Sequence, residues 1–334
     1  METKENSKIA SEDLKIKMFR ERIAQINNVD DKRDLDPEYG YYVYKDDSGK
    51  LHKEYFRPFP SKICYERKEF DYYYGKWIYN QKPSEWKMRI NGSLFEENAE
   101  KIIEVKMPAN LQVIEPETFA KCKNLTNVVF NNGLEEIGAG AFENTNVDEL
   151  NFPSTLNMIE IFAFNNCQNL KTVNFQNGLN FIHNSAFSNT SLKSVNLPSS
   201  LVLIGENAFK DCCLLEELNM EYGIKEIDEA AFMGCTNLKE VILPDSITRI
   251  GDYLFNKCTS LEYVSFPKDL KNLPFILNGC TSLKFVKLPE NVEGYRYEVF
   301  PKCENIVVEG KLQKDDDAFR KCRNVKKYSD EITF

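Results

Sequence analysis

Residues 201–223 read LVLIGENAFKDCCLLEELNMEYG, and the two segments that follow repeat this pattern. Residues 224–246 are IKEIDEAAFMGCTNLKEVILPDS, and residues 247–269 are ITRIGDYLFNKCTSLEYVSFPKD. Each segment has an aliphatic residue at its first and fourth positions, then a Phe, a Cys three residues after the Phe, and a Leu three residues after the Cys. A fixed period of about 23 residues is typical of stacked, nearly identical structural units.

The repeat extends over most of the chain. Full units begin 22 or 23 residues apart, at Leu111, Leu134, Leu156, Leu179, Leu201, Ile224, Ile247 and Leu270. A truncated unit over residues 90–110 comes before them, and weaker units begin at Val292 and Leu312. Terminal units that lose the pattern are expected of a solenoid, because an end unit has no neighbour to cover its apolar face.

Each unit predicts one strand and one turn. In the unit that starts at Ile224, Val241 and Leu243 lie two residues apart, which places them on the same side of an extended strand. Residues 228–232, DEAAF, favour a short helical or 3₁₀ turn on the opposite side of the unit. We therefore predict an α/β solenoid with parallel strands on one face, short helical turns opposite, and about ten units including degenerate caps.

The pattern L-x-x-I-x-x-x-A-F-x-x-C-x-x-L-x-x-V-x-L-P resembles the BspA-like leucine-rich repeat. The residues that carry the resemblance include Leu197-Pro198-Ser199-Ser200-Leu201 and Ala208-Phe209-x-x-Cys212-x-x-Leu215. The resemblance covers about residues 100–326 and implies a leucine-rich-repeat fold. Members of this family are mostly known or presumed binding and adhesion proteins, often on microbial surfaces, so it also implies a binding role.

Composition separates the first 88 residues from the rest. They contain both Trp residues, 10 of the 16 Tyr residues, and 18 Lys and Arg against 17 Asp and Glu. We predict an aromatic-rich N-terminal α+β domain over residues 1–88 and the solenoid over residues 89–334. Within the N-terminal part, the sequence predicts a helix capped by Ser11 and a hairpin that joins residues 41–44 to residues 51–56.

Charge and hydropathy exclude several classes of partner. Of the 43 Lys and Arg and 52 Asp and Glu residues, the part after residue 88 holds 25 and 35, and this acidic surface disfavours a nucleic-acid backbone. No run of 18 apolar residues is present, which argues against a membrane-spanning helix. The first residues are polar, so we expect a cytoplasmic location, with the cell surface possible through another export route.

Eight of the ten cysteines occupy one position of the repeat: Cys122, Cys167, Cys212, Cys235, Cys258, Cys280, Cys303 and Cys322. Cys residues in neighbouring units could form disulfides. The position also accepts Thr190, however, and the unit at Leu134 has Asn-Thr-Asn there. We therefore expect buried free thiols. No C-x-x-C is present, which disfavours a zinc site.

The sequence indicates no catalytic centre and no cofactor. His52 and His183 are the only histidines, and no Ser/His/Asp or Cys/His arrangement or Gly-rich phosphate loop is recognisable. An enzyme with its catalytic site in the N-terminal domain stays one alternative.

Outward positions of the predicted strands are the candidate binding residues. One series contains Glu217, Glu240, Tyr263 and Phe285, and the other contains Asn151, Asn174, Asn196, Asn219, Ile242 and Lys287. They form either a solvated sheet face stabilised by stacked Asn side chains, or a binding surface that is polar at one end and aromatic at the other. We predict a non-catalytic protein-binding module, with a surface adhesin or carbohydrate-binding module as the alternative.

Overall fold

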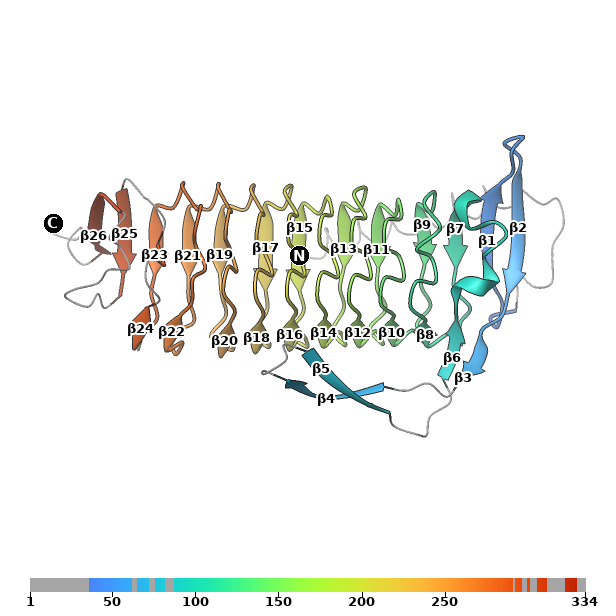
Figure 1. Ribbon diagram of the computed structural model, residues 1–334, viewed down its shortest axis with the longest axis horizontal. Helices are drawn as coiled ribbons and strands as arrows, with labels where there is room; N and C mark the ends of the chain where they lie inside the picture. Colours follow the sequence, from blue (N-terminus) through green and yellow to red (C-terminus); the bar gives the residue numbers. More distant parts are fainter. Residues whose placement is uncertain are drawn as a thin grey trace, which may run out of the picture.

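The chain forms a stack of coils in which two rows of strands face one another (Figure 1). The computed structural model describes residues 36–61, 65–71, 76–81, 87–290, 292–295, 299–300, 305–310 and 322–328. Each full coil contributes one longer strand to one row and one two-residue strand to the other. The structure is therefore a parallel-strand β-solenoid of about nine turns with almost no helix.

The long-strand row contains β7 (Ile102–Lys106), β9 (Asn127–Val129), β11 (Glu149–Asn151), β13 (Thr172–Asn174), β15 (Ser194–Leu197), β17 (Glu217–Met220), β19 (Glu240–Ile242), β21 (Tyr263–Ser265), β23 (Phe285–Lys287), β25 (Asn305–Glu309) and β26 (Asn324–Lys327). The opposite row contains β6 (Lys87–Ile90), β8 (Val113–Ile114), β10 (Glu136–Ile137), β12 (Met158–Ile159), β14 (Phe181–Ile182), β16 (Leu203–Ile204), β18 (Glu226–Ile227), β20 (Arg249–Ile250), β22 (Asn272–Leu273) and β24 (Gly294–Tyr295).

Strand pairing confirms the repeat. Parallel pairs in the central coils join residues 22 or 23 apart in the sequence, as in Ile137 with Ile159 and Tyr263 with Phe285. The short strands from β6 to β20 form one continuous parallel ladder. The long strands form shorter ladders, β7–β9, β11–β13, β15–β17 and β19–β21–β23–β25–β26. The repeat period therefore sets the register of both rows.

A stack of Phe rings runs through the core. Phe142, Phe164, Phe187, Phe209 and Phe232 are fully buried, and successive rings are stacked with centroids 5.1–5.4 Å apart. The stack also includes Phe95, in the truncated first unit, whose ring centroid lies 4.7 Å from that of Phe119. Sequence analysis missed this residue because Asn98, rather than Cys, follows it by three positions. Phe319 of the last unit lies outside the described residues.

The short helical turns predicted opposite the strands do not form in the full coils from Leu111 to Leu270. In the unit at Ile224, the segment over residues 228–232 makes hydrogen-bonded turns, and Ala230 has a φ of 54°. The equivalent residues Asn207 and Tyr253 have φ of 56° and 62°. A left-handed residue at this position in the seven coils that begin between Leu111 and Ile247 prevents a right-handed helix from continuing. The α/β prediction is wrong on this point, and two strand rows replace it.

Backbone hydrogen bonds between coils satisfy the groups that a helix would have paired. The amide of Phe187 donates to the carbonyl oxygen of Ala208 in the next coil at 2.8 Å, and the amide of Phe209 donates to that of Ala231 at 2.8 Å. Because these bonds need a neighbouring coil, the turn conformation depends on stacking and not on local helix propensity.

The N-terminal strands extend the sheets of the solenoid. The predicted hairpin is confirmed: β1 (Gly40–Lys45) pairs antiparallel with β2 (Leu51–Phe56), and β1 also pairs antiparallel with β7. β3 (Phe59–Ser61) pairs antiparallel with β6. β4 (Tyr65–Asp71) and β5 (Lys76–Gln81) form a separate hairpin. The helix predicted from Ser11 lies outside the described residues, and the domain boundary at residue 88 stays a prediction.

The described helical elements are both short 3₁₀ turns in the first coil. They are η2 (Gly92–Leu94), capped by the Asn91 side chain, and η3 (Ala99–Lys101). Between them lies Phe95, which makes T-shaped contacts with Tyr42 and Phe56. The hairpin therefore covers the end of the Phe stack, which would otherwise face water.

The described cysteines of the series are free thiols, and five of them hydrogen-bond between coils, while Cys303 lies outside the described residues. The Sγ atoms of Cys167, Cys212, Cys235, Cys258 and Cys280 lie 3.1–3.3 Å from a Phe carbonyl oxygen of the preceding coil. Where Thr145 and Thr190 replace Cys, their hydroxyl groups donate to the Phe carbonyl of their own coil. Burial raises the pKa of Cys167 and Cys212 to about 11 and that of Cys258 to about 12.

The Phe stack predicts a large cost for truncating a central ring. We expect Phe232→Ala to lower the free energy of unfolding by about 3–5 kcal/mol, because it leaves a cavity between two neighbouring coils. Tyr222→Ala is the control, since Tyr222 is 69% exposed, and it should change stability by about 0.5 kcal/mol or less. Urea unfolding followed by circular dichroism measures both. Equal losses would contradict the central role of the stack.

The buried thiols predict a loss of stability in alkaline solution. An unfolded Cys ionises near its ordinary pKa of 9.0, whereas folded Cys258 holds its proton until about pH 12. Its contribution is therefore complete below about pH 9 and is lost as the pH rises towards 12, at about 1.4 kcal/mol per pH unit. Urea unfolding at several pH values above about 8 measures the slope.

Cys258→Thr is the matched variant for this measurement, because Thr already occupies the position in two coils. Thr does not ionise in this range, so the variant should show a shallower decline of stability with pH. A decline as steep as that of the wild type would show that Cys258 does not contribute to it.

Candidate binding face

The outward positions of the long strands form one continuous face. In the strands from β9 to β19 the second residue is buried, as Leu150, Val195 and Val241 are, and the side chains on either side of it point outward. Pairing places Asn151 beside Asn174 and Tyr263 beside Phe285. The structure therefore brings the predicted site residues into two adjacent rows on a single face, although their role in binding stays a prediction.

The Asn half of the face is an internally satisfied ladder. The Nδ2 atom of Asn174 donates to Oδ1 of Asn151 at 2.6 Å, and that of Asn219 donates to Oδ1 of Asn196 at 2.8 Å. Amides that bond to one another across coils stabilise the sheet and offer fewer free groups to a ligand. This part of the face fits the structural interpretation better than the binding one.

The C-terminal part of the face carries an aromatic cluster. The rings of Tyr263 and Phe285 are stacked with centroids 5.2 Å apart and planes inclined by 13°. Tyr328, which is 44% exposed, makes a T-shaped contact with Phe285, and the two ring centroids are 5.8 Å apart. We call Tyr263, Phe285 and Tyr328 the aromatic cluster.

Sequence analysis missed Tyr328. It follows β26, whose residue Asn324 pairs with Asn305, only 19 positions earlier. The period of 22–23 residues that identified the other outward positions is thus shortened in the last coil, so spacing gave no signal for this residue.

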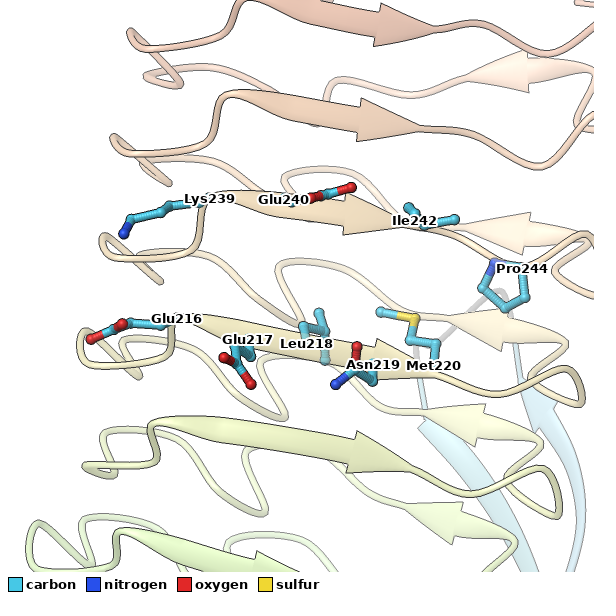
Figure 2. Close-up of a pocket in the computed structure, with 9 residues that line it drawn as sticks. All are labelled: Glu216, Glu217, Leu218, Asn219, Met220, Lys239, Glu240, Ile242 and Pro244. Atoms are coloured by element: carbon cyan, nitrogen blue, oxygen red, sulfur yellow. The ribbon is translucent and has the colours of Figure 1, made fainter. Parts of the chain in front are cut away.

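A groove of about 590 Å³ lies next to the aromatic cluster, between β17 and β19 (Figure 2). The described strands β17 and β19 belong to different hydrogen-bonded ladders, so the groove lies where the long-strand ladder is interrupted. Its lining residues are Glu216, Glu217, Leu218, Asn219, Met220, Lys239, Glu240, Ile242 and Pro244. Four of them, Glu217, Asn219, Glu240 and Ile242, are residues that the sequence predicted for the site.

The groove has an acidic side and an apolar side. Glu216 and Lys239 lie at one end of the two strands, Glu217 and Glu240 come next, and Ile242 and Pro244 lie towards the other end (Figure 2). Ile242 is 57% exposed, the second most exposed large hydrophobic side chain of the described residues. An exposed apolar side chain beside carboxylates is a feature of interaction surfaces rather than of a sealed core.

The carboxylates of the groove differ from those around it in having no ion-pair or hydrogen-bond partner among the described residues. Within the described ranges, the side chains of Glu216, Glu217 and Glu240 take part in no ion pair or hydrogen bond. Neighbouring acids are paired: Glu262 with Lys284 at 2.8 Å and Glu309 with Lys287 at 3.0 Å.

Lys287, one of the predicted site residues, lies beside the aromatic cluster but is paired with Glu309. The carboxylate of Glu309 raises the pKa of Lys287 through a hydrogen bond and through charge attraction, and the pair cancels most of the local charge. The unpaired charge on this part of the face is therefore mainly that of the groove carboxylates, and it is negative.

Neither histidine lies on the binding face. His52 in the hairpin contacts Asp46 at 2.7 Å and stacks on Tyr44. His183 is buried and stacks on Phe181 in the short-strand row. Within the part of the chain that the structure describes, no group of three His, Cys, Asp or Glu side chains is placed to hold a metal ion. The same part contains no helix with the length and hydropathy needed to cross a membrane.

Coils with parallel strands, a repeated Phe and a repeated buried Cys define a leucine-rich-repeat solenoid. The family model described as "BspA type Leucine rich repeat region (6 copies)" matches residues 88–215 and 202–326. The chain therefore belongs to the BspA-type leucine-rich-repeat family. Proteins of this family are typically surface or interaction proteins and are in general not enzymes. No curated protein matches the chain.

Solved structures with the same repeat come from several bacteria. A leucine-rich repeat protein of Bacteroides ovatus is 26% identical over 67% of this chain, with a TM-score of 0.50, and the match spans 65% of that protein. A leucine-rich cell-surface protein of Faecalibacterium prausnitzii is 20% identical, covering 75% of this chain and 84% of its own, with a TM-score of 0.39. The pneumococcal vaccine antigen PcpA is 19% identical, covering 69% and 81%, with a TM-score of 0.34.

Proposed function

We propose that this protein is a non-catalytic interaction module that binds a partner protein on the long-strand face of the coils containing β17 to β23. The observation that carries the proposal is the aromatic cluster beside the acidic groove. Three rings from separate coils, with Tyr328 44% exposed, lie next to carboxylates that no described cation neutralises. Tyr is among the residues most enriched at the energetic centres of protein interfaces.

The charge of the face selects the partner. The groove contributes three carboxylates and one ammonium group, and Lys287 is paired with Glu309. A partner with a basic or mixed-charge patch would be attracted to this face, whereas an acidic partner or a nucleic-acid backbone would be repelled. The family to which the chain belongs consists mainly of interaction proteins, which supports binding over catalysis.

The proposal predicts which side chains a partner needs. A pull-down with the full-length chain supplies the candidate partner, whose dissociation constant is then measured with purified proteins. We expect Tyr263→Ala combined with Phe285→Ala to weaken binding at least about tenfold, or 1.4 kcal/mol, because it removes two stacked rings from the contact surface.

The matched control is Asn174→Ala combined with Asn196→Ala on the same face. These residues belong to the Asn ladder and should affect binding much less. Unchanged binding by the aromatic variant, with unchanged circular dichroism, would place the docking site elsewhere on the molecule.

We also propose that the protein works in the cytoplasm, where thiols stay reduced. The support is the series of buried free cysteines, five of which use the Sγ atom in a hydrogen bond to a backbone carbonyl. Fractionation of the source cells with an antibody against the chain should recover the protein with cytoplasmic markers. Recovery at the cell surface would overturn this location and favour the adhesin alternative.

A further inference from the structure

We infer that the groove between β17 and β19 binds an extended basic segment of the partner, in which a Lys or Arg and an aliphatic residue are separated by one position. The inference rests on the proposed function, since it names the part of the partner that this face recognises. It comes from the arrangement of charge and apolar surface in the groove itself, independently of the aromatic cluster.

The carboxylates of the groove that lack an ion-pair partner among the described residues favour a basic side chain in the bound segment. Glu217 and Glu240 occupy the same outward position on neighbouring strands, and neither has an ion-pair partner within the described ranges. Both side chains are exposed, so a partner can reach them. The two carboxylates point in different directions (Figure 2), so a guanidinium or ammonium group in the groove would form charge-assisted hydrogen bonds with one of them and be attracted by the other. Lys239, at the end of the groove, lies one position before this row.

The next outward row of the groove is apolar on β19 and favours an aliphatic side chain in the bound segment. Ile242 lies two residues after Glu240 on β19, and Asn219 lies two residues after Glu217 on β17. Side chains two residues apart on a strand point to the same side and are about 6.6 Å apart. Met220 and Pro244 continue the apolar surface from there.

An extended segment lying along the strands has the same spacing. Its side chains at positions i and i+2 also project on one side at about 6.6 Å, so a cation opposite the Glu row places the residue two positions away opposite Ile242. The aliphatic stem of Lys or Arg can itself cover the intervening surface while its charged end reaches the carboxylates. The groove thus fits the pattern basic-x-aliphatic, and a helical segment would not match this spacing.

The experiment selects heptapeptides from a random phage-displayed library on the full-length protein. A selected peptide is then synthesised with capped ends, and its affinity is measured by fluorescence polarisation. We expect enrichment of Lys or Arg two positions away from Leu, Ile or Val, in the order set by the direction in which the segment binds. We expect Glu217→Gln combined with Glu240→Gln to weaken the selected peptide at least tenfold, and Ile242→Ser to weaken it severalfold.

The matched control is Glu149→Gln combined with Glu262→Gln, which removes the same number of charges outside the groove, one on β11 and one directly before β21. It should change the affinity less than twofold, because only the general field of the protein is altered. Replacing the peptide's basic residue by Gln should weaken its binding to the wild type. The same peptide change should cause little further loss of affinity for the variant that combines Glu217→Gln with Glu240→Gln, as expected of groups in direct contact.

The possible outcomes separate this inference from the proposed function. Failure to enrich any peptide, enrichment without the basic-x-aliphatic pattern, or equal effects of the two Glu pairs would overturn the inference. If the aromatic variant still weakens the native partner in that case, the proposed function stands. If the peptide binds as expected and the partner binds the aromatic variant as tightly as the wild type, the groove inference stands and the aromatic docking site is wrong.

Discussion

Every other feature of this molecule depends on contact between one coil and the next at the repeated Phe. The ring stacks on its neighbours, while its amide donates to the backbone carbonyl of the following coil. A single unit of about 23 residues cannot bury such a ring or pair such an amide by itself. Stability is therefore shared between neighbours, and the ends need covers, one of which is the β1–β2 hairpin over Phe95.

The same contact makes the long-strand face available for recognition. Because the core is filled by residues that point inward at fixed positions, the outward positions are released from packing and can differ from coil to coil. The chain uses this freedom unevenly. Paired Asn residues occupy one outward row from β11 to β17, whereas aliphatic and aromatic side chains occupy the face from β19 to β23. A rigid row of this kind presents side chains at a spacing that an extended partner can match.

The buried cysteines show how a repeat position can serve packing and hydrogen bonding together. A thiol is small enough for the interior and donates weakly to the Phe carbonyl of the preceding coil, while Thr reaches the carbonyl of its own coil. Either residue thus finds a backbone carbonyl as a hydrogen-bond partner inside the core. This explains why the position tolerates Thr without a disulfide or a metal being involved, and why burial raises the pKa of the thiols.

The sequence by itself determined the solenoid, the register of the strands, the buried Phe and Cys positions, and which residues share the outward face, because all of these follow from a period of 22–23 residues. Tertiary structure alone decided the rest. The left-handed turn residues, such as Ala230 and Tyr253, carry no common residue type, since hydrogen bonds to the next coil impose their conformation. The interruption between β17 and β19, the pairing of Lys287 with Glu309, and the contact of Tyr328 with Phe285 join residues whose spacing or chemistry gives no local signal. They depend on how the coils stack in space.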